Sequence, residues 1–512
     1  KNGSCEGYGR GNNPSHFEYM FQRDTDYCSG AFLLTRKDLF DKLNGFDPTY
    51  KPAYYEEVDF CVRLWKLGKR VVYDPRIVIL HYEFASSKKR EDAIELQIRN
   101  CQKFVGTHEK WLGKRDTTLR LPNVAKRDIP SGKLRILFLE DKVPHQHLGS
   151  GFTRSHRIIL ELVKQGNFVT LFPTNYPDEA WDKVYSDIPR TVEVAIGLGR
   201  KKLEPFLSDR IGYYDVILAS RPHNLQAIRS IRESSPEIFK STKLIYDAEA
   251  LYCIREFTEA ALKNQPLSED EQKAKIQKEI GLTAGCDAVI SVSALETDKF
   301  AEQGVKNIHT VGFCINNRMS PSLFEERRDI LFVGSVHLMA SPNADSIKWF
   351  SKEVFPKIQK RLNEQCRFII AGTSLVPELE LEINALQNKD IEFVGSVPDL
   401  SQIYNQTRIF VAPTRYAAGI PQKVCEAAAY GIPVVSTSLI AQQLGWQNEK
   451  ELLVADTAED FSRACTRLYT DERMWVNIRE NASSSVNKDC SPEIFSKRIK
   501  DLLNTVVKKS TS

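Results

Sequence analysis

The sequence predicts an α/β protein whose helices alternate with parallel strands in two doubly wound lobes. Three stretches carry this prediction. Residues 409–437 read as a strand, a glycine-bearing turn, a helix and a second strand. Residues 133–172 repeat that order around a glycine-rich loop, and residues 329–397 contain further apolar strands with polar or glycine-containing tips. Alternation of this kind is typical of parallel sheets, in which ligands bind beyond the carboxyl ends of the strands.

Length and composition limit the classes of protein to which the chain can belong. Its 512 residues are too many for one hydrophobic core and suggest about three domains. The 71 basic and 67 acidic residues leave a net charge of +4, which gives no indication of nucleic-acid binding. No apolar run reaches the roughly 18 residues that a membrane span requires, and eleven cysteines without paired spacing indicate reduced thiols in a cytoplasmic protein. The chain begins at Lys1 in loop-like sequence, so we expect it to be part of a longer protein.

Residues 1–116 form the first predicted segment, in which a cluster of acids opens a helix. One strand is expected within residues 26–34 and another toward His81. Three acids, Glu57 and Asp59 among them, lie in the first turn of the helix. The helix dipole favours acids at that place, so capping alone would account for them.

The segment resembles the second half of a family 2 glycosyltransferase, an inverting enzyme of the GT-A fold. The resemblance rests on Glu-Glu-Val-Asp-Phe at 56–60 and Gly-Lys-Arg-Val-Val-Tyr-Asp-Pro at 68–75. It implies that Glu57 is the catalytic general base on the acceptor hydroxyl, with Asp59 as a second candidate. It implies Mg²⁺ or Mn²⁺, with His81 beside the ion, only in an intact GT-A domain. The first half of that domain, with its Asp-x-Asp motif, is missing, so we expect this partial GT-A α/β segment to be inactive by itself.

Residues 117–132 are polar, contain two prolines and read as a linker to a lobe at 133–315. This lobe begins with a strand, the loop Gly149-Ser150-Gly151 and a helix. The loop lacks the full dinucleotide fingerprint, which disfavours NAD binding. Two later strands end in polar tips that would meet at one edge of a parallel sheet. Arg154, at the start of the helix, and four residues at the strand tips are the candidates in this lobe for binding the acceptor of a group transfer. The four are Arg221, His223, Asp247 and Glu249.

Residues 327–490 form the second predicted lobe, and residues 491–512 form a final helix that is expected to return to the first lobe. The central unit of the second lobe is the turn Ala417–Pro421 and the helix after it, which carries Lys423 and Glu426. The turn offers backbone amides and a helix N-terminus to an anion, and Lys423 adds a positive charge. Glu426 lies one turn further, where a carboxylate can accept two ribose hydroxyls. A core α/β unit without a ligand would show the same local pattern.

This unit resembles the donor-site signature of family 4 glycosyltransferases, which are retaining enzymes with the GT-B fold of two Rossmann-like lobes. The family pattern has two glutamates separated by seven residues, followed by Ala and then Gly-x-Pro-Val-Val. Glu426 matches the second glutamate, whereas Ala418 stands in place of the first, which approaches the donor sugar in the family. The resemblance implies that Lys423 is a catalytic group that stabilises the leaving diphosphate. The donor-binding residues that it implies are Gly151, Gly334, Ser335, Gly372, Thr373, Val397, Gly419, Ile420, Pro421, Gln422, Lys423, Val424 and Glu426.

Together the two resemblances suggest a tandem bacterial glycosyltransferase, in which the C-terminal half of a family 2 enzyme precedes a complete family 4 enzyme. We expect it to move a sugar from a nucleotide-diphosphate sugar to a glycan or lipid-linked glycan acceptor in surface polysaccharide synthesis. The alternatives are a non-catalytic protein that binds nucleotide sugars or glycans, and a GT-B sugar-nucleotide epimerase, for which Ala418 removes a needed carboxylate.

The same resemblances imply which partners the chain has. No cofactor is expected for the GT-B part, and no nucleic acid is expected as a partner. A cytoplasmic location, with peripheral association at the inner face of the membrane, would suit a lipid-linked acceptor.

Overall fold

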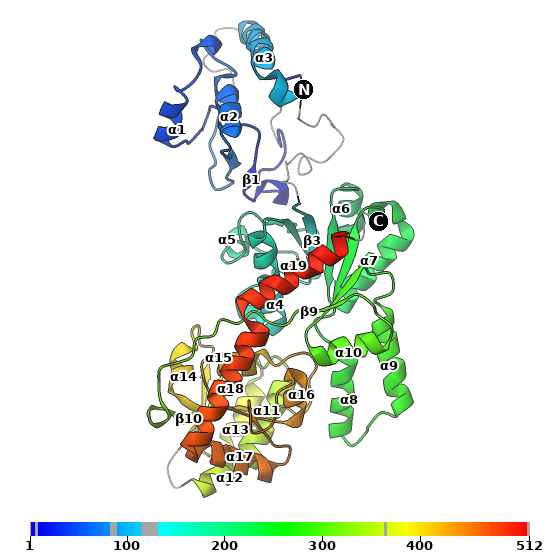
Figure 1. Cartoon of the computed structure of the whole chain (residues 1–512), viewed down its shortest axis with the longest axis vertical. Coiled ribbons are helices and arrows are strands. Elements are labelled where there is room, and N and C mark those ends of the chain that lie inside the picture. The colour runs from blue at the N-terminus through cyan, green and yellow to red at the C-terminus, as the bar shows by residue number, and fades with distance from the viewer. Residues whose placement is uncertain (1, 6–8, 82–89, 114–131, 363–365, 509–512) are drawn as a thin grey trace. The chain divides into compact units, whose positions relative to one another are not determined.

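The computed structural model describes residues 2–5, 9–81, 90–113, 132–362 and 366–508 (Figure 1). Apart from Gly132, the predicted linker lies outside the described residues. The chain divides into two compact units, one comprising Lys1–Val143, Leu162–Ile217 and Ser230–Thr242, the other Pro144–Glu161, Leu218–Arg229 and Lys243–Ser512. The domain boundaries expected from the sequence stay predictions. None of the described helices is both long and apolar enough to cross a bilayer.

The N-terminal segment consists of short helices and one small sheet. Its elements are the 3-10 turns η1 (Phe17–Tyr19) and η2 (Pro48–Tyr50), the strands β1 (Arg23–Asp24) and β2 (Val72–Tyr73), and the helices α1 (Lys37–Lys42), α2 (Glu56–Lys66) and α3 (Arg90–Leu112). The two strands pair antiparallel. Val58, Val62 and Phe104 belong to a buried cluster that packs α2 against α3.

Both longer strands predicted in this segment are wrong. Residues 26–36 form turns and irregular backbone, and no strand follows β2 in the residues up to His81. The apolar side chains of Val78 and Leu80 are exposed as a result. An apolar run becomes a strand only beside a partner that takes up its backbone hydrogen bonds, and the described residues contain no such partner here.

A seven-stranded parallel sheet follows in the order β5-β4-β3-β6-β7-β8-β9. Its strands are β3 (Arg135–Glu140), β4 (Phe168–Pro173), β5 (Glu193–Val194), β6 (Val216–Ser220), β7 (Lys243–Asp247), β8 (Ala288–Ser291) and β9 (Ile308–Thr310). The helices between them are α4 (Ser150–Lys164), α5 (Trp181–Val184), α6 (Leu203–Ser208), α7 (Pro222–Ser234), α8 (Tyr252–Leu262), α9 (Glu269–Gly281) and α10 (Ala294–Glu302), with short 3-10 turns at Gln146–Leu148, Arg200–Lys202 and Pro236–Phe239. The strands are almost wholly buried, as expected for a parallel sheet covered on both faces.

A six-stranded parallel sheet has the order β12-β11-β10-β13-β14-β15. Its strands are β10 (Arg328–Val333), β11 (Phe368–Ala371), β12 (Ile391–Gly395), β13 (Thr407–Ala412), β14 (Val434–Ser436) and β15 (Leu453–Val454). Its helices are α11 (Pro342–Trp349), which continues through a π-turn at Phe350–Val354 into α12 (Phe355–Arg361), then α13 (Pro377–Asn384), α14 (Ser401–Gln406), α15 (Gln422–Ala429), α16 (Ser438–Leu444), α17 (Ala458–Thr470), α18 (Glu472–Cys490) and α19 (Pro492–Lys508). A 3-10 turn at Phe324–Glu326 precedes the sheet.

The strand order of this second sheet places a switch point beside β10. From β10 the chain moves outward to β11 and β12, then returns to the other side of β10 to form β13. Loops that leave neighbouring strands in opposite directions open a crevice at their carboxyl ends, where ligands bind in open α/β sheets. The loop after β10 and the turn between β13 and α15 lie at that edge. The predicted α/β class with two parallel, doubly wound sheets is therefore confirmed.

Candidate functional site

The turn between β13 and α15 is the centre of the candidate site. Gly419 adopts a φ of +78°, a left-handed conformation that favours glycine, and Pro421 precedes the helix as its N-cap residue. The Gly419 N–H donates to Glu296 Oε1 at 3.3 Å. Among the described residues, the amides of Ile420 and Lys423 have no hydrogen-bond acceptor. These two amides and the N-terminus of α15 can therefore accommodate an anion.

Lys423 provides the positive charge of the site. Its Nζ donates to Asn343 Oδ1 at 2.7 Å and lies 4.1 Å from the centre of the Phe332 ring. Burial lowers the pKa of Lys423 to about 7, because the ammonium loses its water and faces a neutral oxygen in place of a carboxylate. Asn343 is fixed in turn by donating from Nδ2 to the Ser335 carbonyl at 2.8 Å. An anion at this place would restore the charge of the lysine.

Two strand ends beside Lys423 pack too closely for a side chain. β10 and β11 end side by side, and the Gly334 N–H donates to the Ala371 carbonyl at 2.9 Å. A Cβ on Gly372, whose φ is +140°, would lie 2.5 Å from the Gly334 carbonyl oxygen. A Cβ on Gly334 would lie 2.8 Å from Asn343 Nδ2. The two glycines therefore let the strand ends and Asn343 come together.

The remaining donor-side candidates lie along the same sheet edge. Thr373 follows β11, and half-buried Val397 follows the neighbouring strand β12. Gln422 Nε2 donates to Glu426 Oε1 at 2.6 Å, and burial raises the pKa of the Glu426 carboxyl. Val424 is fully buried in the core, so its side chain cannot contact a ligand.

Arg154 and Asp247, predicted on the acceptor side, form a buried ion pair. Arg154 Nη1 donates to both Asp247 carboxylate oxygens, at 2.9 and 2.7 Å, and its other two nitrogens donate to the Val311 carbonyl. Both side chains are almost completely buried. This geometry favours a supporting role, in which the pair fixes the carboxyl end of β7, over direct contact with an acceptor.

Arg221 and Glu249 meet at the carboxyl ends of the neighbouring strands β6 and β7. Arg221 Nη1 lies 3.3 Å from Glu249 Oε2, which also accepts from the Tyr252 hydroxyl at 3.0 Å. Both residues have positive φ, +76° and +58°, a strain that clusters at functional sites. A Cβ on Gly151 would lie 1.6 Å from Glu249 Oε1, so a side chain there would have to displace this carboxylate. His223 follows directly in the first turn of α7.

The sequence interpretation missed two residues of this site, Asn343 and Glu296. Asn343 follows the serine and proline that open α11, and Glu296 follows the serine that caps α10, so both look like ordinary helix-start residues. Their contacts to Lys423 and Gly419 join positions 80 and 123 residues apart. A single sequence carries no signal for such pairs.

A cavity of about 490 Å³ lies away from this site, beside the amino ends of β8 and β9. Asp287, Ala288 and Asn307 are among its lining residues. At Gly419 the turn packs against the loop around Ala250, because the position of a Cβ on Gly419 is 3.4 Å from the Ala250 Cβ.

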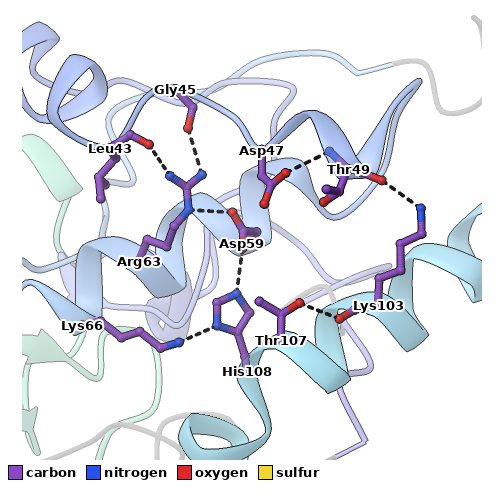
Figure 2. A network of polar contacts seen from close by, with 10 residues as sticks. All are labelled: Leu43, Gly45, Asp47, Thr49, Asp59, Arg63, Lys66, Lys103, Thr107 and His108. Atoms are coloured by element: carbon purple, nitrogen blue, oxygen red, sulfur yellow. Dashed lines mark hydrogen bonds and ion pairs between the residues drawn. The ribbon is translucent and has the colours of Figure 1, made fainter.

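In the N-terminal segment, Asp59 is the centre of a polar network (Figure 2). It is 1% exposed, and its two oxygens accept from Arg63 Nε and from His108 Nε2, each at 2.7 Å. Arg63 also donates to two carbonyls of the 43–45 turn, and Lys66 Nζ donates to His108 Nδ1 at 2.7 Å. With both oxygens engaged and no access to solvent, Asp59 is placed to hold α2, α3 and the turn after α1 together.

Glu57, two residues before Asp59 in the same helix, has a different environment. Its Oε2 is buried and has no hydrogen-bond partner among the described residues, and burial raises the pKa of its carboxyl. Tyr54 and Tyr55 before it both have positive φ, and Asn100 Nδ2 donates to the Tyr54 carbonyl at 3.0 Å. A raised pKa at a helix start that follows a strained, fixed loop suits the general base predicted from the sequence.

His81 is exposed. The described residues contain no group of three or more His, Cys, Asp or Glu side chains arranged to hold a metal ion. The metal expected for an intact GT-A domain therefore stays a prediction.

Comparison with solved structures identifies the fold of the two sheets. Residues 327–471 match the model of the family described as glycosyl transferases group 1. Anabaena Alr3699/HepE, solved with UDP and glucose, is 17% identical with a TM-score of 0.52, over 73% of this chain and 100% of that one. Sucrose-phosphate synthase from Thermosynechococcus elongatus is 15% identical with a TM-score of 0.56, over 74% of this chain and 100% of that one. The fold is GT-B. At sequence identities of 15% and 17%, this likeness shows the fold only and says nothing of activity.

Curated relatives match shorter stretches. Rhamnosyltransferase WbbL of Escherichia coli (strain K12) is 42% identical over 57 residues, 11% of this chain and 21% of that protein. The N-acetylglucosaminyl-diphospho-decaprenol L-rhamnosyltransferase of Mycobacterium tuberculosis is 33% identical over 93 residues, 18% of this chain and 30% of that protein. An uncharacterized 44.6 kDa protein in the cps region of Klebsiella pneumoniae is 26% identical over 179 residues, 34% of this chain and 45% of that protein. The chain spans less than half the length of each of these relatives.

The two acids of α2 should respond differently to substitution. We expect Asp59→Ala to destabilise the helix pair α2–α3 by about 3 kcal/mol, because Arg63 and His108 would lose their buried partner. Glu57→Gln should leave this stability within about 0.5 kcal/mol, because it removes no hydrogen bond that the structure shows. Hydrogen exchange of the α2 and α3 amides in the whole chain measures both, and equal protection in the two variants would contradict the supporting role of Asp59.

The close approach of β10 and β11 can also be tested. We expect Gly372→Ala to cost about 2 kcal/mol or more, because its Cβ would meet the Gly334 carbonyl and its φ is unfavourable for alanine. Gly395→Ala is the matched control, since Gly395 also has positive φ but opens into free space. Chemical unfolding followed at the six-stranded sheet should separate the two variants, and equal losses would show that the close contact is unimportant.

Proposed function

We propose that the two-lobed part of the chain transfers a sugar from a nucleotide-diphosphate sugar, with retention of the anomeric configuration. The observation that carries the proposal is the buried Lys423 beside two unbonded amides, at the switch point of the six-stranded sheet. This point lies inside the region that matches the glycosyltransferase model. A diphosphate supplies the anion for which these groups are arranged, and Lys423 would stabilise it as it leaves the sugar. The proposal assigns no metal or cofactor to this step.

The acceptor in this proposal is a glycan or a lipid-linked glycan, at the cytoplasmic face of the membrane in surface polysaccharide synthesis. The rhamnosyltransferase names of two relatives, and the cps region of a third, support this class of product. Arg221 and Glu249 are the acceptor-side groups with the best placement, since they meet at the strand ends. The N-terminal segment would add a second, family 2-like acceptor site with Glu57 as its base.

A non-catalytic nucleotide-sugar-binding protein is the second candidate. Two observations favour it: Ala418 carries no carboxylate, and Gly419 is already bonded to Glu296 in the structure. Such a protein would hold the nucleotide sugar without cleaving it.

One experiment separates the two candidates. The whole chain is titrated with UDP-, GDP- and dTDP-sugars by calorimetry, and each mixture is then followed for release of the nucleoside diphosphate. Binding with cleavage supports the transferase, and binding without cleavage in the presence of glycan acceptors supports the second candidate. Failure of every nucleotide sugar to bind would exclude both.

The pKa of Lys423 gives the proposal a pH signature. The lysine is charged below about pH 7 in the free protein, and a bound diphosphate favours the charged form, so its pKa rises on binding. Above pH 7, binding must take up a proton, and the Kd for a nucleotide sugar should rise by up to about tenfold per pH unit. Lys423→Met should bind weakly at every pH and lose this slope. A slope that survives in the methionine variant would contradict the assignment.

Glu426 should contribute to nucleoside binding. We expect Glu426→Ala to raise the Kd for the bound nucleoside diphosphate by about 10- to 100-fold, because a hydrogen bond to a charged group is worth about 1.5–3 kcal/mol. Glu378→Ala, at an exposed acid of α13, is the control and should leave the Kd unchanged. Calorimetry measures both Kd values, with the nucleoside diphosphate of whichever nucleotide sugar binds in the titration. An unaltered affinity would remove Glu426 from the site.

A further inference from the structure

Glu296 is a buried acid that contacts the turn of the candidate site with only one of its two carboxylate oxygens. It lies in the first turn of α10, where Ser293 Oγ accepts from its backbone N–H at 3.2 Å and caps the helix. Its side chain is only 3% exposed. Capping of α10 therefore needs the backbone of Glu296 and leaves its carboxylate for another purpose.

One oxygen of this carboxylate joins two loops of the candidate site. Oε1 accepts from the Leu251 N–H at 3.2 Å and from the Gly419 N–H at 3.3 Å. Leu251 lies two residues after Glu249, and Gly419 lies four residues before Lys423. The carboxylate thus connects the turn that carries the donor-side lysine with the loop that carries the acceptor-side acid.

The second oxygen, Oε2, is buried and has no hydrogen-bond partner among the described residues. A buried carboxylate oxygen without a donor costs about 1–3 kcal/mol, and such atoms in native proteins call for an explanation. Burial also raises the pKa of Glu296 to about 7, which reports the same desolvation. Because both oxygens belong to one carboxylate, Oε2 lies close to Oε1, the atom that accepts from the Gly419 N–H.

The position of Gly419 along the sheet edge indicates which donor would reach Oε2. The nucleoside candidates Thr373 and Val397 follow β11 and β12, on one side of β10, and the turn follows β13 on the other side. A nucleotide sugar whose diphosphate lies at Lys423 would therefore direct its sugar toward Gly419. Sugar hydroxyls are neutral donors, whereas a phosphate oxygen carries no proton and would be repelled by a carboxylate.

We propose that Glu296 is a specificity-determining residue whose free oxygen accepts a hydrogen bond from a hydroxyl of the donor sugar. This inference rests on the proposed function of the turn. It assigns sugar recognition to α10, an element far from the glycosyltransferase signature in the sequence. Glu296 takes no part in bond making and acts by positioning the sugar.

The test compares each nucleotide sugar with its own nucleotide. The probes are UDP-glucose with UDP and dTDP-rhamnose with dTDP, titrated into the whole chain. Glu296→Gln keeps Oε1 for the two amides and replaces the free carboxylate oxygen by an amide nitrogen. We expect it to raise the Kd of the nucleotide sugar that binds by about five- to tenfold, because a charge-assisted hydrogen bond is lost. The Kd of the matching nucleotide should change less than about twofold.

A matched control is Glu279 of α9, which contacts the residues directly after Leu251. Glu279 accepts from the Tyr252 and Cys253 amides with its two oxygens, at 2.8 and 2.9 Å, and has no free oxygen. Glu279→Gln should therefore leave the ratio of the two Kd values unchanged. Glu296→Asp keeps the charge but withdraws it by one methylene, so it should lose the same preference for the nucleotide sugar over the nucleotide. It replaces the glutamine variant in the test if that variant does not fold.

The outcomes separate the inference from the proposed function. Equal weakening of sugar and nucleotide in Glu296→Gln, or no weakening of either, would overturn the inference and leave the proposed function standing. If the wild-type chain binds no UDP-, GDP- or dTDP-sugar, the proposed function falls, and the inference falls with it.

Discussion

A buried ammonium beside a neutral oxygen is the interaction on which the candidate site depends. Lys423 has exchanged water for the amide oxygen of Asn343 and the face of Phe332, and this exchange lowers its pKa to about 7. Two glycines allow this arrangement: Gly334 leaves room for the Asn343 side chain, and Gly372 lets the end of β11 approach the Gly334 carbonyl. Because Lys423 has no anionic partner in this arrangement, a bound anion would stabilise its charged form. The unbonded amides of the turn also favour an anion.

Local patterns in the sequence predicted the elements of this site well. The alternation of strands and helices, the turn around Gly419 and the lysine after it all depend on neighbours along the chain, so the sequence alone contains the information. Asn343 and Glu296 could not be found, because their partners lie in other elements. Arg154, at a helix start, and Asp247, at a strand tip, were expected as acceptor-side groups. Their burial as an ion pair could not be predicted, because only the fold brings the two charges together.

The first turn of α2 shows how environment separates identical chemistry. Glu57 and Asp59 both belong to a cluster of acids that a helix dipole would explain equally well. Asp59 accepts hydrogen bonds from Arg63 and His108 and is buried between α2 and α3. Glu57 has one carboxylate oxygen, Oε2, that accepts no hydrogen bond from the described residues. The strands predicted around these acids did not form, because extended apolar runs depend on partners that no local pattern supplies.

The fit of Glu249 against Gly151 has a consequence for how the chain can change over time. Oε1 of Glu249 occupies the volume that any side chain at position 151 would need, and Arg221 pairs with the same carboxylate. A side chain at position 151 would displace this carboxylate from its place beside Arg221. Homologous sequences with a side chain at position 151 should therefore differ from this chain at position 249 or hold the Glu249 carboxylate in another place, which gives a criterion for grouping them.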